Sequence, residues 1–123
     1  MQSILKPKII IFNYDLDSLD FLCCELYDTY DIYPISETVS ITEILATIDP
    51  DLIIIDLDST DNLSAKFLIS QTKQPHLQAI PLLLTASNDK IQSRALLKNH
   101  TYIAKPYTLN YLQECISQQL IKL

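Results

Sequence analysis

Three side chains of different chemical type each stand at the end of a short apolar run of the sequence. They are Asp56, Thr85 and Lys105. A carboxylate can attack phosphorus as a nucleophile, a hydroxyl can donate to a phosphoryl oxygen, and an ammonium group supplies a compact positive charge. At about 4 Å and an effective dielectric constant of about 20, that ammonium group attracts one negative charge by about 4 kcal/mol. These residue types together indicate a site suited to a phosphoryl group.

Each of the three residues also has an ordinary structural explanation. Asp56 could cap the segment that follows it, or form a structural ion pair with Lys105. Thr85 could be a β-branched residue that simply favours a strand. A functional site therefore requires that the fold bring the three side chains to one place.

Four short apolar runs are the expected strands that would position these side chains. Because they are too short for helices and lack polar alternation, they are typical of strands buried on both faces. They are residues 8–13, 52–56, 79–85 and 102–105. A fifth strand is expected at 32–35, where Pro34 suits a sheet edge because proline has no hydrogen-bond donor.

Five further segments predict helices, because apolar residues recur in them every three to four positions. They are residues 16–30, 41–48, 63–72, 88–98 and 109–123. Leu16 is expected on the buried face of the first. The expected N-caps are Asp15 or Asp17, Ser40, Asp61 or Asn62, Ser87 and Thr108.

Strands that alternate with helices predict an α/β fold with a parallel, doubly wound sheet and right-handed crossovers. In such sheets, ligands bind outside the carboxyl ends of the strands, where the strand order reverses. We therefore expect Asn13, Asp56, Thr85 and Lys105 to meet at that edge. The chain of 123 residues fits a single domain, 1–123.

The charge and hydropathy of the chain argue against several function classes. Lys and Arg number 9 against 15 Asp and Glu, a net charge of −6, so direct binding to nucleic acid is not expected. No apolar run approaches the roughly 18 residues of a membrane-spanning helix, and 1–7 lacks the apolar core of a signal peptide. We expect a cytoplasmic protein without membrane contact. Cys23, Cys24 and Cys115 show neither metal-ligand nor disulfide spacing.

The order and spacing of these segments resemble the receiver domain of bacterial two-component response regulators, over nearly the whole chain. The matching stretches are Asn13–Asp15, Pro50–Asp56, Ile80–Ala86 and Tyr102–Tyr107. The resemblance implies a flavodoxin-like, doubly wound (βα)5 three-layer sandwich. Its five-stranded parallel sheet would have the order 2-1-3-4-5.

The resemblance also implies a role for individual residues. Asp56 matches the phospho-acceptor, Thr85 the switch hydroxyl and Lys105 the lysine that contacts the phosphoryl group. Tyr102 matches the aromatic residue whose position reports phosphorylation. The Lys105–Pro106 bond matches a cis peptide bond, which is inexpensive only before proline.

The sequence departs from the family at the end of the first strand. The family has two adjacent acids there that hold a magnesium ion, and this chain has Asn13 and Tyr14. Tyrosine, with a reference pKa of about 10, is neutral at pH 7, and an amide is a weak magnesium ligand. Either a metal binds through Asp56, Asp58, Asp15 and backbone carbonyls, or the site is not phosphorylated in the usual way.

Two functions remain open on this basis. The first is a stand-alone receiver domain in a phosphorelay, which accepts a phosphoryl group on Asp56 from a histidine kinase or phosphotransfer protein and acts on a downstream protein. A homodimer through the face of helix 4, strand 5 and helix 5 belongs to this hypothesis. The second is a pseudo-receiver that binds proteins without phosphorylation, with Tyr102, Tyr107 and Tyr111 as aromatic anchors.

An enzyme is not expected from this sequence. There is no glycine in the chain and hence no glycine-rich phosphate loop. Neither His76 nor His100 belongs to a recognisable catalytic triad.

Overall fold

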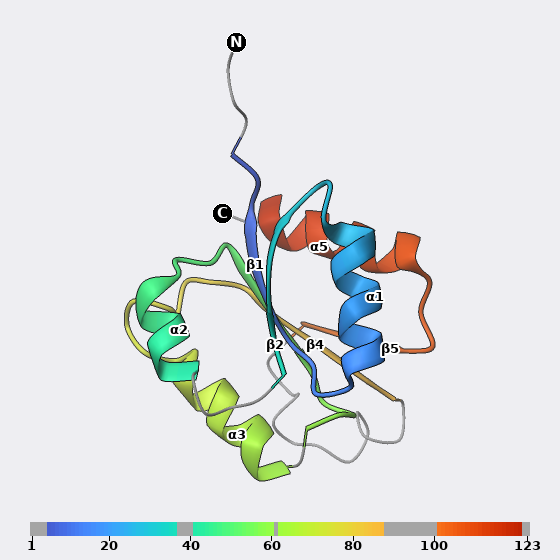
Figure 1. Cartoon of the computed structure of the whole chain (residues 1–123). Coiled ribbons are helices and arrows are strands. Elements are labelled where there is room, and N and C mark those ends of the chain that lie inside the picture. The colour runs from blue at the N-terminus through green and yellow to red at the C-terminus, as the bar shows by residue number, and fades with distance from the viewer. Residues whose placement is uncertain (1–4, 37–40, 61, 88–100, 122–123) are drawn as a thin grey trace.

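The computed structural model describes residues 5–36, 41–60, 62–87 and 101–121. Within these residues the chain forms five strands and four helices (Figure 1). In chain order they are β1 (Lys8–Phe12), α1 (Leu16–Leu26), β2 (Asp31–Ile35), α2 (Ile41–Thr47), β3 (Leu52–Asp56), α3 (Asn62–Gln71), β4 (Leu82–Ser87), β5 (Thr101–Lys105) and α5 (Leu109–Ile121).

The five strands form one parallel sheet in the order β2-β1-β3-β4-β5. This order confirms the predicted doubly wound sheet. β2 lies on one side of β1, and β3, the next strand along the chain, lies on the other side, so the strand order reverses between β1 and β3. The carboxyl ends of β1 and β3 therefore flank the switch point. β2 is an edge strand, as predicted from Pro34. In the sheet, Pro34 lies opposite Ile11 of β1.

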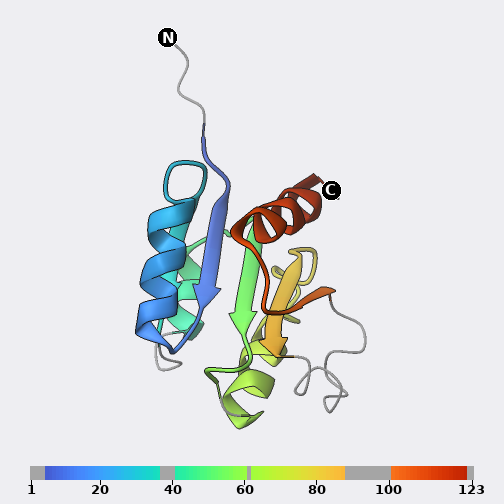
Figure 2. The same ribbon diagram turned by 90° about the vertical axis from the view of Figure 1, so that its right-hand side faces the viewer.

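Helices cover both faces of the sheet and complete the predicted three-layer sandwich. Figures 1 and 2 show α1 and α5 on one face and α2 and α3 on the other. Successive residues of β3 alternate between the two cores: Ile53 packs with the α2 and α3 side, and Ile54 with the α1 and α5 side. All five residues of β3 are buried. The uninterrupted apolar run of β3 therefore reflects burial on both faces.

Three details of the predicted elements are wrong. The first helix ends at Leu26 and not at residue 30. Leu16 is 61% exposed, because it is the first residue of α1 and that end of the helix extends past the tip of β1 (Figure 2). β4 begins at Leu82 instead of residue 79 and continues past Thr85 to Ser87. Pro81 has no N–H for the ladder, and its carbonyl accepts the Ile53 N–H at 3.1 Å just before the strand starts.

Of the predicted helix N-caps, the structure confirms Thr108 and shows no capping hydrogen bond from Asp15. Thr108 Oγ1 accepts the Tyr111 N–H at 3.1 Å and caps α5, as predicted. Asp15 occupies the N-cap position of α1 without a capping hydrogen bond from its side chain. Ser87 is the last residue of β4, and the helix that it is predicted to cap lies outside the described residues. The predicted caps Ser40 and Asp61, the predicted helix 88–98 and His100 lie outside the described residues.

The helices of the described residues are short. The longest, α5, has 13 residues, against about 20 for a bilayer-spanning helix. No helix in this part of the chain is long and apolar enough to cross a membrane.

Candidate functional site at the carboxyl edge of the sheet

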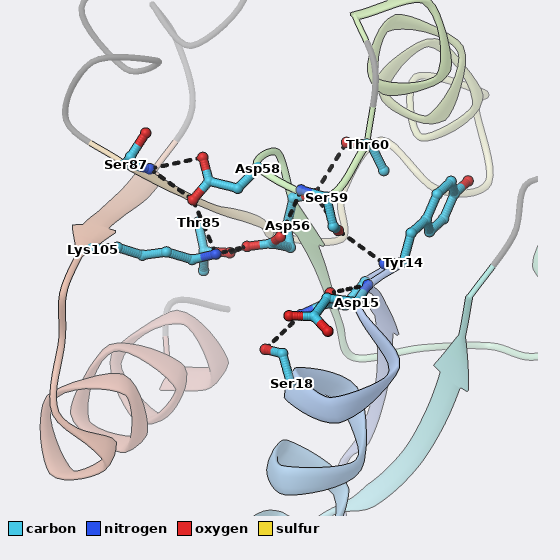
Figure 3. Close-up of polar contacts among 11 residues, drawn as sticks. Tyr14, Asp15, Ser18, Asp56, Asp58, Ser59, Thr60, Thr85, Ser87 and Lys105 are labelled. Carbon is cyan, nitrogen blue, oxygen red and sulfur yellow. Dashed lines mark hydrogen bonds and ion pairs between the residues drawn. The ribbon is translucent and has the colours of Figure 1, made fainter.

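The acid, the hydroxyl and the lysine singled out in the sequence meet at one edge of the sheet. Asp56 and Thr85 are register partners on β3 and β4, and Ser87 and Lys105 are partners on β4 and β5. Thr85 Oγ1 donates to Asp56 Oδ1 at 2.8 Å, and Lys105 Nζ forms an ion pair with the same oxygen (Figure 3). The parallel strands thus place all three side chains in contact at one edge of the sheet.

Asp56 is a buried carboxylate whose two oxygens are both engaged. The residue is 3% exposed, and its Oδ2 accepts the Ser59 N–H at 3.0 Å. Its backbone carbonyl accepts the Thr60 hydroxyl at 3.0 Å, which holds the loop that follows β3. A buried carboxylate is costly unless it is paired and hydrogen-bonded. The arrangement around Asp56 meets that condition.

Asp58 forms a second acidic partner for the lysine. Its Oδ2 lies 3.1 Å from Lys105 Nζ, so that one ammonium group contacts both Asp56 and Asp58. Both Asp58 carboxylate oxygens also lie 3.1 Å from the Ser87 nitrogen, and its N–H donates to them. Asp58 therefore ties the end of β4 to the end of β5.

The pKa values of both partners respond to this pairing. Partial burial would lower the pKa of Lys105, but the hydrogen bonds and charges of Asp56 and Asp58 outweigh burial and raise it. Partial burial would raise the pKa of Asp58, but the Ser87 N–H and Lys105 outweigh burial and lower it. Both charged forms are therefore stabilised in the folded state.

These directions predict a pH dependence of stability. Because folding lowers the pKa of Asp58, its contribution is complete above its unfolded pKa, about 3.9, and is lost as pH falls through the folded value. We expect the urea midpoint of the wild-type chain to fall more steeply below about pH 4 than that of Asp58→Asn. Parallel profiles for the two proteins would contradict this expectation. The raised pKa of Lys105 has the opposite sign, and its contribution is lost only as pH rises through that value.

The end of β1 forms a closed turn into α1. Asn13 is 2% exposed, its Oδ1 accepts the Asp15 N–H at 2.9 Å, and its Nδ2 donates to Ser18 Oγ at 3.1 Å. The Tyr14 N–H donates to Ser59 Oγ at 2.8 Å, which joins this turn to the loop after β3. Asn13 thus has a structural role in the turn.

Sequence reasoning missed Ser18, Ser59 and the contact between Asp58 and Ser87. An Asx turn could have been suspected from Asn13 two residues before Asp15, because asparagine often bonds the backbone two residues on. No comparable signal marks Ser59, because its contacts depend on the shape of a loop.

The three acids predicted as alternative metal ligands, Asp15, Asp56 and Asp58, do not form one metal-binding cluster in this structure. Asp15 is exposed, and the described residues contain no group of three Asp, Glu, His or Cys side chains that could hold a metal ion. The Asn13 amide oxygen already accepts the Asp15 N–H, and Lys105 already contacts Asp56 and Asp58. Magnesium is commonly bound by one or two carboxylates together with several waters. In the described residues the two neighbouring carboxylates, Asp56 and Asp58, are instead both paired with Lys105.

The remaining predicted residues lie on the β5 side of the site. The Lys105–Pro106 peptide bond is cis. Tyr102 is 48% exposed, and Tyr111 is also exposed. Tyr107 is half-buried against the α1 and α5 core, and burial is the main cause of its raised pKa. The segment that would form helix 4 of the expected dimer face lies outside the described residues.

No protein-family model and no curated protein matches this sequence. Solved structures do match its fold. The receiver domain of a two-component response regulator from Bacteroides fragilis is 19% identical, with a TM-score of 0.82 over 96% of this chain and 99% of that one. The chemotaxis response regulator CheY4 of Vibrio cholerae is 14% identical, with a TM-score of 0.78 over 92% and 98%.

A third match carries a metal. The receiver domain of a sensor histidine kinase from Pseudomonas aeruginosa, with a magnesium ion coordinated in its active-site cleft, is 17% identical. Its TM-score is 0.76 over 94% of this chain and 98% of that one. At such identities the likeness concerns the fold. The chain has the flavodoxin-like fold of response-regulator receiver domains.

Proposed function

We propose that this chain is a receiver module of a phosphorelay, in which Asp56 accepts a phosphoryl group. The observation that carries the proposal is the meeting of Asp56, Thr85 and Lys105 at the carboxyl edge of the sheet. Structural neighbours with the same fold are response-regulator receiver domains. The module transmits a signal and does not turn over a substrate.

The reaction is a transfer of the phosphoryl group from a donor to the Asp56 carboxylate. An Asp56 oxygen forms a bond to phosphorus while the bond from phosphorus to the donor breaks. For a phosphohistidine donor, the electron pair of the breaking P–N bond goes to the imidazole nitrogen, which takes a proton from water. Lys105 and the Thr85 hydroxyl stabilise the charge on the phosphoryl oxygens.

The partners of such a module are proteins. A histidine kinase or a phosphotransfer protein donates the phosphoryl group, and a downstream protein receives the signal. The net charge of −6 favours protein over nucleic acid as a partner. Exposed Tyr102 and Tyr111 offer aromatic contacts for that partner, or for a second copy of the chain.

At this site Lys105 is the positive charge that faces the phosphoryl group, whereas a site with a bound metal ion has the charge of the ion as well. Phosphorylation adds about −1.5 to −2 charges, and Lys105 supplies one positive charge beside Asp56. Because Asp56 and Asp58 are both paired with Lys105, no step of the reaction is assigned to a metal.

A second function is favoured by the end of β1. The amide of Asn13 bonds to Asp15 and Ser18 and stands where acids would bind a cation. A pseudo-receiver that binds proteins without phosphorylation fits this observation. The two functions differ in whether Asp56 ever carries phosphate.

Chemical phosphorylation separates these functions. The wild-type chain is incubated with acetyl phosphate, with and without Mg²⁺, and its intact mass is measured. We expect the mass of one phosphoryl group to be gained by the wild-type chain and by Asp49→Ala, whose exposed acid lies at the opposite edge of the sheet, but not by Asp56→Asn. No gain by the wild-type chain, or an equal gain by Asp56→Asn, would refute phosphorylation at Asp56 and leave the pseudo-receiver.

A further inference from the structure

We propose that the Asp58 carboxylate is an internal anion that occupies the phosphoryl-binding donors of this site and must leave them before a phosphoryl group can bind. The donors are Lys105 Nζ and the Ser87 N–H. Asp58 thus acts as a positioning residue that restrains the site. This inference deepens the proposed function and names a control of the same site.

The contacts of Asp58 are those that an oxyanion would make. Its Oδ2 lies 3.1 Å from Lys105 Nζ, and both its oxygens accept the Ser87 N–H at 3.1 Å (Figure 3). An ammonium group and a backbone N–H at the end of a strand are common partners of phosphate oxygens. In this structure the Asp58 carboxylate takes the place of the phosphate oxygens.

Asp58 and a phosphoryl group on Asp56 would compete for one cation. Lys105 Nζ contacts Asp56 Oδ1 and Asp58 Oδ2 at the same time, so a group attached to Asp56 arises next to Asp58. The new group adds about −1.5 to −2 charges beside an acid whose pKa is already lowered. Like charges so close together repel, and one lysine cannot neutralise both.

The exposure of Asp58 makes displacement feasible. Its side chain is 27% exposed, whereas that of Asp56 is 4% exposed. Asp58 can turn toward solvent and be hydrated, whereas Asp56 cannot. Displacement would also release the Ser87 N–H, which Asp58 holds at the last residue of β4. Binding of the phosphoryl group would thereby change the hydrogen bonding of the last residue of β4.

Binding of inorganic phosphate tests this inference without requiring phosphoryl transfer. Three variants are titrated with inorganic phosphate at constant ionic strength, and the amide resonance of Ser87 is followed by NMR. They are Asp56→Asn, Asp56→Asn with Asp58→Asn, and Asp56→Asn with Asp49→Asn as the charge-matched control. Asparagine keeps an oxygen that can accept the Ser87 N–H while it removes the competing charge.

We expect removal of the Asp58 charge to strengthen phosphate binding by about tenfold over Asp56→Asn alone, and the Asp49 control to have less than about a threefold effect. Equal affinities for the Asp58 variant and the control would overturn the inference. If the double variant does not fold, Asp58→Asn alone is compared with Asp49→Asn in the same titration, with the same two outcomes.

Labelling by acetyl phosphate separates this inference from the proposed function. Faster labelling of Asp58→Asn than of Asp49→Asn supports both. No labelling of any variant, together with stronger phosphate binding by the Asp58 variant, would refute phosphoryl transfer and retain the internal anion. Labelling at equal rates, together with equal phosphate affinities, would retain the proposed function and overturn the role of Asp58.

Discussion

Replacement of Lys105 by methionine is expected to lower the free energy of unfolding by about 2–4 kcal/mol. Asp56 is 3% exposed, and without the ammonium group the described residues would offer its carboxylate only the hydrogen bonds from Thr85 and Ser59. Breaking a buried ion pair is costly because it leaves a buried charge uncompensated. The Lys105 side chain is 30% exposed, so water can reach the vacated position and reduce the cost. Urea denaturation at pH 7 measures the difference.

Two further variants show whether the pair itself is responsible. In the double variant Lys105→Met with Asp56→Asn the buried charge is removed too, and we expect at least half of the lost stability to return. Lys66, exposed on α3, is the matched control, and Lys66→Met is expected to change stability by less than about 0.5 kcal/mol. A loss for Lys105→Met no greater than for Lys66→Met would show that Asp56 does not depend on the lysine.

The strands and their order could be predicted from the sequence because burial on both faces leaves a strong pattern. The run Leu52–Asp56 has no polar residue before its last position, and all of it is buried in the structure. The ends of the elements were less predictable. Apolar residues precede Pro81, yet β4 starts only after it, because the missing N–H of proline is a backbone effect that hydropathy does not record. Leu16 is apolar but 61% exposed at the first position of α1.

The convergence of Asp56, Thr85 and Lys105 could be predicted for a geometric reason. Parallel strands end at the same edge of a sheet, so residues near the ends of neighbouring strands must lie close together. The contacts of Asp58 and Asn13 could not be predicted in this way, because they depend on loop conformations with no periodic pattern. The loop after β3 positions Asp58 for its contacts with Lys105 and Ser87. The proposed restraint of the site depends on these contacts.

The burial of β3 on both faces predicts large and similar effects for two successive residues. Ile53 and Ile54 are 0% and 3% exposed and pack into different cores on opposite faces of the sheet. Each substitution, Ile53→Ala and Ile54→Ala, removes buried methyl and methylene groups and leaves a cavity, which costs about 2–5 kcal/mol. We expect both variants to unfold at clearly lower urea concentration than the wild-type chain, with an unchanged slope m.

A strand with only one buried face would behave differently. Side chains alternate along a strand, so one of two neighbouring isoleucines would then face water, and its loss would cost little. Ile121 of α5 is 79% exposed and provides the reference, with an expected change below about 0.5 kcal/mol for Ile121→Ala. If either β3 variant matched that reference, β3 could not be the doubly covered central strand. Asp56, the last residue of β3, would then lose the rigid support that holds it against Thr85 and Lys105.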